Sequence, residues 1–335
     1  MAVTRRTPPK TWSLLGEVRR RPSVYEATAA KFNYHFRREP APFEMDPTAA
    51  INLWYLEHRE GSAFNVADWE GFRDPAKLTY SDYVNLQHER ETYLDLLIDH
   101  HELVGSVDAL DPAWVATLTR LLVPMRFPLH VLQMTGLYVG QMSPSAFIIN
   151  CANFQAADEM RRIQRLAYLT RMLANAHGDQ IAATATARDP WQSDAQWQPL
   201  REASERMLGV YDWGESFTAL NLALKPVIDA VVNEQLTQLA IAHGDEFLAL
   251  LLAEFQRDTT RSQNWTAALV QYAVGADPAL ADTLRGWLDV HVPRADAAVA
   301  GIAELFASAP QPVGAGQVIE AASAARGRLL AACGL

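Results

Sequence analysis

Apolar side chains recur every three to four residues through most of the chain from about residue 80 onward, which is the period of an amphipathic α-helix. In the first such stretch, residues 80–103, the side chains of Tyr83, Leu94 and Leu97 share one face, and Gly105 follows as a stop signal. The strict alternation of a half-buried strand is missing from the sequence. The pattern therefore predicts an all-α protein.

Three pairs of residues mark helix starts, because a capping side chain followed by proline satisfies the free N–H groups of a first turn. They are Asp111-Pro112, Ser143-Pro144 and Asp277-Pro278. With the apolar period, they predict long helices at 112–142, 144–177, 196–242 and 244–273, and shorter ones at 278–291, 294–308 and 315–331.

Prolines and a polar stretch should interrupt this series. Pro124 and Pro128 are expected to kink the first long helix, and Pro226 is expected to kink or break the third. Residues 178–195 hold Gly178, Asp179, Asp189 and Pro190 and are expected to form a long crossover between two helix pairs. Four long helices with one long central connection indicate a ferritin-like, ribonucleotide-reductase-like bundle.

The first fifty residues differ from the rest, since they are rich in Arg, Pro and aromatic side chains and lack a regular apolar period. We predict an irregular arm over residues 1–50, which packs on the chain's own bundle or on a partner, and a single all-helical domain over 51–335. Ser23 and Glu26 have the spacing of a capping box, which predicts a short helix inside the arm.

Composition and charge exclude several classes of protein. The formal net charge of −10 argues against a nucleic-acid partner, because phosphate binding requires a basic face. No apolar run is long enough to cross a membrane, and the polar, basic first twenty residues do not resemble a signal peptide. Two cysteines make no disulfide framework, so we expect a cytosolic protein.

The centre of the predicted helix 144–177 carries the most informative motif. In di-iron bundles, a Glu and a His three residues later lie on one helix face and bind one metal. Here Glu159 is followed at that distance by Arg162, which offers no lone pair to a metal. No glutamate in the chain has a histidine three residues later. Phosphate-binding glycine loops and a nucleophile elbow are also missing.

Several strings of residues together resemble a known family over about residues 10–335. They are Lys10-Thr11-Trp12-Ser13, Arg20-Arg21-Pro22-Ser23-x-Tyr25-Glu26, Asp68-Trp69-x-x-Phe72-Arg73-Asp74-Pro75, Leu132-Gln133-Met134, Asn150-Cys151-Ala152, Asp212-Trp213-Gly214-Glu215-x-Phe217-Thr218-Ala219-x-Asn221-Leu222 and Lys225-Pro226. The chain resembles the β subunit of the hydroxylase in bacterial multicomponent di-iron monooxygenases, in the branch that acts on toluene and on alkenes such as isoprene.

The resemblance implies that the positions of a di-iron site have lost their ligands in this chain. The positions are Leu137, Glu159, Arg162, Glu215, Thr259 and Ser262. Arg162 and Ser262 stand where histidines would be, Thr259 and Leu137 stand where glutamates would be, and only Glu159 and Glu215 remain carboxylates. We therefore expect no catalytic residue, no cofactor and no metal in this chain.

Arg162 could supply the positive charge that a metal ion would otherwise provide, by pairing with Glu159 or Glu215. Alternatively, it could simply cap a stripe of polar residues on the surface. The first alternative requires a buried, paired guanidinium, because an unpaired buried charge is strongly destabilising.

The resemblance also implies a role and partners. The expected role is architectural: the chain would support an iron-bearing α subunit and help it dimerise in an (αβγ)₂ hydroxylase. An effector protein, a Rieske-type ferredoxin and an NADH reductase would complete the system, which inserts one oxygen atom of O₂ into an aromatic hydrocarbon or an alkene. The alternatives are a stand-alone di-metal carboxylate oxidase with atypical ligands, or a helical scaffold of another complex.

The arm supplies the candidate contacts with a partner. They are Trp12, Arg20, Arg21, Tyr25, Phe32 and Tyr34. Trp54 and Tyr55 are either further contacts or residues of the chain's own core.

Overall fold

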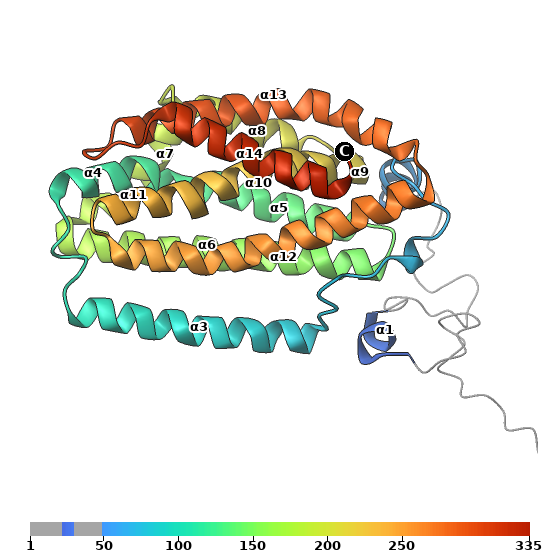
Figure 1. Ribbon diagram of the computed structural model, residues 1–335, viewed down its shortest axis with the longest axis horizontal. Helices are drawn as coiled ribbons and strands as arrows, with labels where there is room; N and C mark the ends of the chain where they lie inside the picture. The colour runs from blue at the N-terminus through green and yellow to red at the C-terminus, as the bar shows by residue number, and fades with distance from the viewer. Residues whose placement is uncertain (1–21, 30–48) are drawn as a thin grey trace, which may run out of the picture.

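The computed structural model describes residues 22–29 and 49–335, and these residues are helical throughout, with no strand among them. The long helices lie side by side along one axis, with α3 (Tyr80–Leu103) on one side and α13 (Leu280–Ala307) and α14 (Ala315–Cys333) on the other (Figure 1). The all-α, ferritin-like long-helix bundle predicted from the sequence is confirmed.

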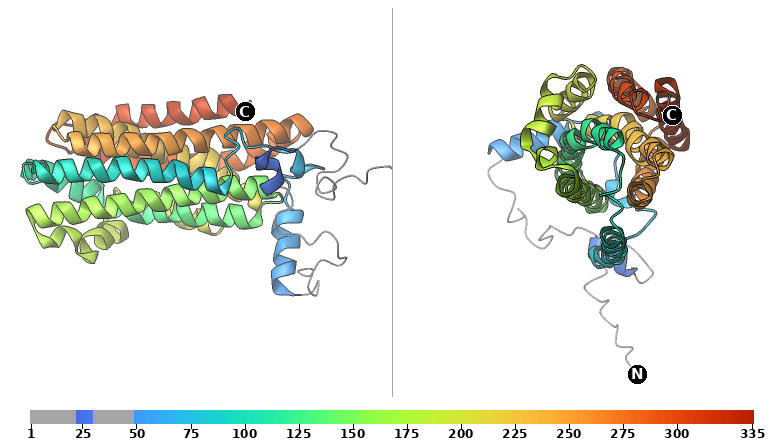
Figure 2. Two further views of the ribbon diagram at one scale, coloured as in Figure 1. Left: turned by 90° about the horizontal axis from the view of Figure 1, so that it is seen from below. Right: turned by 90° about the vertical axis from the view of Figure 1, so that its left-hand side faces the viewer.

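The centre of the molecule is formed by helical rods that run side by side along one axis (Figure 2). They are α5 (Arg126–Met142), α6 (Ala146–His177), α12 (Glu246–Ala276) and a composite rod over residues 213–242. The composite rod consists of α9 (Trp213–Phe217), η6 (Thr218–Leu224), α10 (Lys225–Asp229), η7 (Ala230–Gln235) and α11 (Leu236–Ala242). Both η6 and η7 are π-helical, so the wide turns of this rod flank α10 on either side.

Shorter elements cover the ends and sides of these rods. They are α1 (Val24–Ala29), α2 (Ala50–Tyr55), η2 (Leu56–Glu60), η3 (Trp69–Gly71), α4 (Pro112–Leu121), η4 (Val123–Met125), η5 (Asp179–Ala182), α7 (Thr184–Ser193) and α8 (Gln198–Leu208). The α2 helix stands roughly across the bundle axis and projects from one end (Figure 2). None of its side chains is fully buried.

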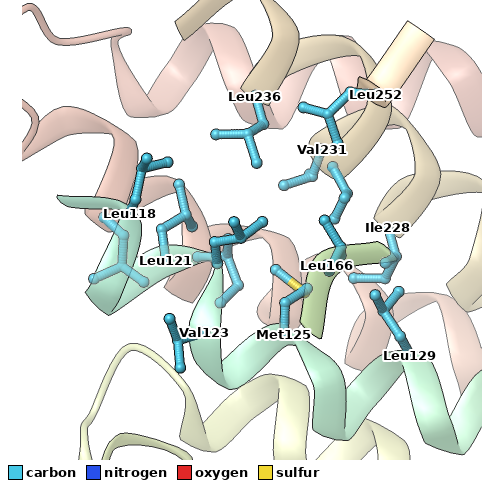
Figure 3. Close-up of a cluster of buried hydrophobic side chains, with 14 of the residues drawn as sticks. Leu118, Leu121, Val123, Met125, Leu129, Leu166, Ile228, Val231, Leu236 and Leu252 are labelled. Carbon is cyan, nitrogen blue, oxygen red and sulfur yellow. The ribbon is translucent and has the colours of Figure 1, made fainter. Parts of the chain in front are cut away.

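One half of the bundle is held together by aliphatic side chains. Leu118 and Leu121 of α4, Leu129 of α5, Leu166 of α6 and Ile228 of α10 belong to one cluster of buried side chains (Figure 3), and each is at most 3% exposed. Truncating one such leucine to alanine typically destabilises a protein by about 2–5 kcal/mol. These side chains form an apolar core in this half of the bundle.

The other half is held together by aromatic rings. Phe64, Trp69 and Phe72 from the 62–75 segment pack against Trp213 and Phe217 of the composite rod. The ring centroids of Trp69 and Trp213 are 5.2 Å apart in an edge-to-face arrangement. A side chain at Gly214 would overlap Phe64, so this close approach requires glycine.

Asp212 fixes the start of the composite rod at this aromatic end. Its carboxylate accepts hydrogen bonds from the N–H groups of Gly214 and Glu215 at 2.8 and 3.0 Å, and from the Ser62 hydroxyl at 2.8 Å. Trp69 of the string at 68–75 packs on Trp213 of the string at 212–222, so two of the strings that carry the resemblance meet in space.

Several predicted boundaries are wrong. The helix predicted at 196–242 is divided, because α8 ends at Leu208 and Asp212 caps a new helix. Residues 178–195, expected to form a long crossover between two helix pairs, contain the short elements η5 and α7. The two helices predicted at 278–291 and 294–308 are one helix, α13, with Pro293 inside it. The helix predicted at 112–142 is divided by η4 at Pro124, while Pro128 lies in the first turn of α5.

Other local predictions are confirmed. The Asp111 carboxylate caps α4 by accepting from the N–H of Ala113 at 2.8 Å. Ser23 and Glu26 form the expected reciprocal capping box, with N–H to side-chain distances of 3.0 and 3.2 Å. The division into an arm over 1–50 and a domain over 51–335 stays a prediction, because most of the arm lies outside the described residues. In the part of the chain that the structure describes, no helix is long and apolar enough to cross a membrane.

Candidate functional site

Four of the six predicted site positions come together at the centre of the four rods. Glu159 and Arg162 of α6 and Thr259 and Ser262 of α12 line one cavity with room for about one water molecule. Their side chains are at most 6% exposed. The i, i+3 spacing on α6 places Glu159 and Arg162 on the same face of that helix.

Two charged residues of α10 complete this centre. The four side chains form a closed ring of salt bridges, which we call the ion ring and which consists of Glu159, Arg162, Lys225 and Asp229. Asp229 accepts from Lys225 Nζ and from Arg162 Nη1, each at 2.8 Å. Glu159 accepts from Lys225 through Oε1 and from Arg162 through Oε2. Two negative and two positive charges cancel inside the protein.

The contacts of the ring favour the charged forms of Arg162, Lys225 and Asp229. Burial alone acts to lower the pKa of Arg162, but the carboxylates of Glu159 and Asp229 raise this pKa above its ordinary value. The pKa of Lys225 is raised for the same reason, by Asp229 and Glu159 against the effect of burial. Burial acts to raise the pKa of Asp229, but Lys225 and Arg162 lower it. The predicted pairing of Arg162 with Glu159 is therefore present, and the surface-stripe alternative is wrong.

Neutral hydrogen bonds extend from the ring into α12. Asn233 accepts from Arg162 at 3.4 Å and donates to the Thr259 hydroxyl at 3.0 Å. The Ser262 hydroxyl donates to Gln155 at 2.9 Å, and the Trp265 indole N–H donates to the same oxygen at 3.0 Å. Thr259 and Ser262 thus hold neighbouring side chains in place.

The structure places the two other predicted positions elsewhere. Leu137 is 46% exposed on α5 and does not face the centre. Glu215 is half-buried at the aromatic end, where its Oε1 lies 2.9 Å from Nε2 of His291 on α13. Glu215 is therefore wrong as a partner of Arg162. The reason is its place along the rod: Glu215 lies in the first turn of the composite rod, about two and a half helical turns before Lys225, at the end that packs on the aromatic rings.

Lys225 and Asp229 were missed as site residues. The only signals in the sequence are their i, i+4 spacing, which allows a salt bridge on one helix, and the Lys225-Pro226 string of the resemblance. Neither signal says that the pair faces Glu159, which is 66 residues away in the chain.

The candidate partner contacts can be placed only in part. Tyr25 is 5% exposed and packs on Phe147 of α6, with ring centroids 5.4 Å apart, so it forms part of the chain's own core, and its contact with a partner stays a prediction. Trp54 and Tyr55 are half-buried against the aromatic core, and the Trp54 indole donates to the Tyr138 hydroxyl at 3.1 Å. Trp12, Arg20, Arg21, Phe32 and Tyr34 lie outside the described residues.

A second, partly buried cluster of charges, the arginine cluster, joins α3 to α6 and α12. Its members are Arg90, Glu91 and Asp95 of α3, Asp158, Arg161 and Arg165 of α6, and Asp258 and Arg261 of α12. Asp258 accepts from Arg161 at 2.7 Å and from Arg261 at 3.0 Å, and also from Arg90. Burial and the neighbouring Asp258 raise the pKa of Asp158 to about 7.

The donor atoms of the ion ring do not fit a di-iron centre. A charged arginine or lysine has no lone pair for a metal, and both carboxylates already use both oxygens on these cations. Within residues 22–29 and 49–335, no group of three or more His, Cys, Asp or Glu side chains is arranged to hold a metal ion. The arrangement is that of a neutral, cross-linked core.

Comparison with known proteins identifies the family. Residues 54–277 match the family described as methane/phenol/alkene hydroxylase. The chain is 32% identical over 330 residues to the β subunit of the hydroxylase component of the toluene-4-monooxygenase system of Ectopseudomonas mendocina, which covers 98% of this chain and 99% of that protein. It is 26% identical over 276 residues to the oxygenase component DmpL of phenol 2-monooxygenase from Pseudomonas sp. strain CF600, with 80% and 82% covered.

Solved structures agree with this assignment. A chain in the structure of toluene 4-monooxygenase with toluene bound in its resting active site superposes with a TM-score of 0.84 at 33% identity, covering 91% of this chain and all of that one. A chain of xenon-pressurised phenol hydroxylase from Pseudomonas sp. OX1 shares the fold, with a TM-score of 0.76 at 22% identity. This chain therefore belongs to the methane/phenol/alkene hydroxylase family of bacterial multicomponent monooxygenases, as a subunit of the hydroxylase component.

Proposed function

We propose that this chain is the non-catalytic, architectural β subunit of its hydroxylase. In this proposal it packs against an iron-bearing α subunit, helps that subunit to dimerise, and keeps its helices in working geometry. The observation that supports this role most directly is the ion ring, because two cations occupy the place where the bundle would otherwise converge its metal ligands. The chemistry would take place in α.

The rest of the system follows from the same proposal. The hydroxylase would be an (αβγ)₂ assembly in the cytosol, served by an effector protein, a Rieske-type ferredoxin and an NADH reductase. It would insert one oxygen atom of O₂ into an aromatic hydrocarbon or an alkene. The similarity to toluene and phenol monooxygenase subunits supports this class of substrate.

Metal content and co-purification test the proposal together. The chain is expressed alone and with the α subunit of its hydroxylase, and iron and partner are measured by mass spectrometry. We expect iron-free β that co-purifies with iron-loaded α. About two irons bound by this chain alone would overturn the proposal in favour of a stand-alone di-metal oxidase. Failure to prefer a hydroxylase α subunit in the pull-down would favour a scaffold of another complex.

A further inference from the structure

The ion ring has the connectivity of two cations bridged by two carboxylates. Glu159 contacts Lys225 with one oxygen and Arg162 with the other, and Asp229 contacts the same two cations with its own pair of oxygens. A surface salt bridge rarely uses both oxygens of both acids in this way. Carboxylates that bridge two metal ions do so, with one oxygen on each ion.

The position of the ring is also that of a metal centre. Its members come from two facing rods, α6 and α10, at the middle of a four-helix bundle, and their side chains are 1–6% exposed. Metal sites in such bundles are built from inward-pointing carboxylates and a Glu-x-x-His pair. Glu159 and Arg162 have this spacing, with arginine in the histidine position.

We propose that Arg162 and Lys225 are built-in counterions that fill a latent divalent-cation site, whose ligands are the carboxylates of Glu159 and Asp229. With both cations present, the centre of the bundle is complete without metal. With the cations removed, two buried carboxylates face each other and need positive charge from elsewhere. Mn²⁺ and Zn²⁺ supply it, since both bind carboxylate and imidazole ligands.

Exchange of the two counterions for ligands tests this inference. The double variant Arg162→His, Lys225→Glu restores Glu-x-x-His on α6 and adds a third carboxylate. The full-length variant and the wild type are melted in EDTA, in Mn²⁺ and in Zn²⁺, and bound metal is counted by native mass spectrometry. We expect the variant to have a lower midpoint than the wild type in EDTA. Saturating metal should raise its midpoint by at least about 5 °C, while the wild type does not respond.

A matched control separates this site from a general effect of charge. Arg257→Glu with Arg188→His makes the same change of charge at exposed positions of α12 and α7, where each arginine pairs with one acid and the new histidine has no carboxylate three or four residues away. This control should show no metal-dependent midpoint. A double variant that folds without responding to either metal would overturn the inference, as would a wild type whose midpoint falls in EDTA.

If the double variant does not fold, two single variants decide the question. Arg162→Lys keeps the positive charge, whereas Arg162→Met has a similar volume without it. The urea midpoint of Arg162→Lys should be clearly higher than that of Arg162→Met. Equal midpoints would mean that position 162 needs only volume, and the counterion role would be wrong. The inference does not depend on the subunit role, because co-purification with α is read out separately.

Discussion

Asp229 shows how strongly a buried charge in this protein depends on its partners. The side chain is 1% exposed and accepts from two cations, each at 2.8 Å. Water cannot replace these partners at the middle of the bundle. The energetic value of the ion ring therefore appears mainly when one member is lost, because the remaining charges stay buried without compensation.

The first prediction concerns the substitution Asp229→Asn. It should lower the free energy of unfolding by about 3–5 kcal/mol, since Lys225 and Arg162 are then left with one carboxylate between them. The matched control is Asp282→Asn, which removes an exposed i, i+3 pair with Arg285 and should change stability by no more than about 0.5 kcal/mol. Equilibrium urea unfolding measures both, and equal effects would contradict the prediction.

The second prediction concerns pH and Asp158. Its pKa in the folded protein, about 7, is higher than in the unfolded chain, where it has the ordinary value of 3.8. Between these values the unfolded state releases this proton while the folded state keeps it, so this group makes stability fall as pH rises from about 4 to 7. Asp158→Asn should remove that fall.

Thermal unfolding of the wild type and Asp158→Asn at pH 5 and pH 7.5 provides the measurement. The loss of midpoint between the two pH values should be smaller in the variant. An exposed acid, Asp189, serves as the control, and Asp189→Asn should leave the pH dependence unchanged. A variant with the same pH dependence as the wild type would show that Asp158 does not titrate in this range.

At the scale of the elements, α3 differs from the other long helices. It lies at the side of the bundle (Figure 1), and much of its contact with α6 and α12 runs through the arginine cluster. Only one strip of it is apolar and buried, around Leu94 and Leu97. Charged contacts of this kind tie the helix to its neighbours at specific positions and leave much of its outer surface exposed.

The third prediction is therefore local. Asp258→Asn removes the carboxylate shared by Arg90, Arg161 and Arg261, and it should weaken the attachment of α3 while the central rods stay folded. Hydrogen exchange measured by mass spectrometry should be faster in peptides from 80–103 than in wild type, by about tenfold or more. The control is Glu102→Gln. Glu102 is also on α3, where it makes an exposed contact with Tyr168 of α6, and its substitution should have little effect.

The sequence predicts single elements well and their pairing poorly. The helix predicted at 80–103 is α3, and those predicted at 144–177 and 315–331 differ from α6 and α14 by two residues at one end. Caps and apolar period are local signals, so they can be read from one stretch of chain. The division of the 196–242 helix depends on Asp212 and its contact with Ser62, 150 residues away, which no local pattern reveals.

The same limit applies to the site. Glu159 and Arg162 could be paired from the sequence because they are three residues apart on one helix. Lys225 and Asp229 could not be placed in the site from the sequence. The direction in which their side chains point depends on the π-helical turns on either side of α10. Leu137 and Glu215 were misplaced because alignment to a family motif does not determine which way a side chain points.

At the scale of the whole molecule, apolar surface remains uncovered. Ile51, Leu53 and Leu56 near α2 are about half exposed, and Leu96 and Leu103 of α3 are 65% and 85% exposed. Monomeric proteins rarely leave large contiguous apolar patches in water. The exposed side chains on α2 and α3 are what a subunit of a larger assembly presents.

The fourth prediction follows from this surface. Expressed alone, the chain should self-associate or be poorly soluble, and light scattering should give a mass above that of one chain. The variant Ile51→Ser, Leu53→Ser, Leu56→Ser should lower the measured mass without lowering the melting midpoint by more than about 2 °C, because these side chains are not core residues. A wild type that stays monomeric at high concentration would contradict the prediction.

The π-helical turns of the composite rod have a consequence for comparing related chains. A π-helical turn holds one residue more than an α-helical turn, so deleting one residue within Thr218–Leu224 would let the rod rewind as α-helix. Because the extra residue is absorbed within the wide turn, the segments on either side would keep their direction, and Lys225 and Asp229 would still face Glu159 and Arg162. The same deletion in a regular α-helical stretch would rotate everything after it by about 100°. In an alignment, a one-residue gap within Thr218–Leu224 is therefore compatible with an intact ion ring, whereas a gap in the middle of α6 is not.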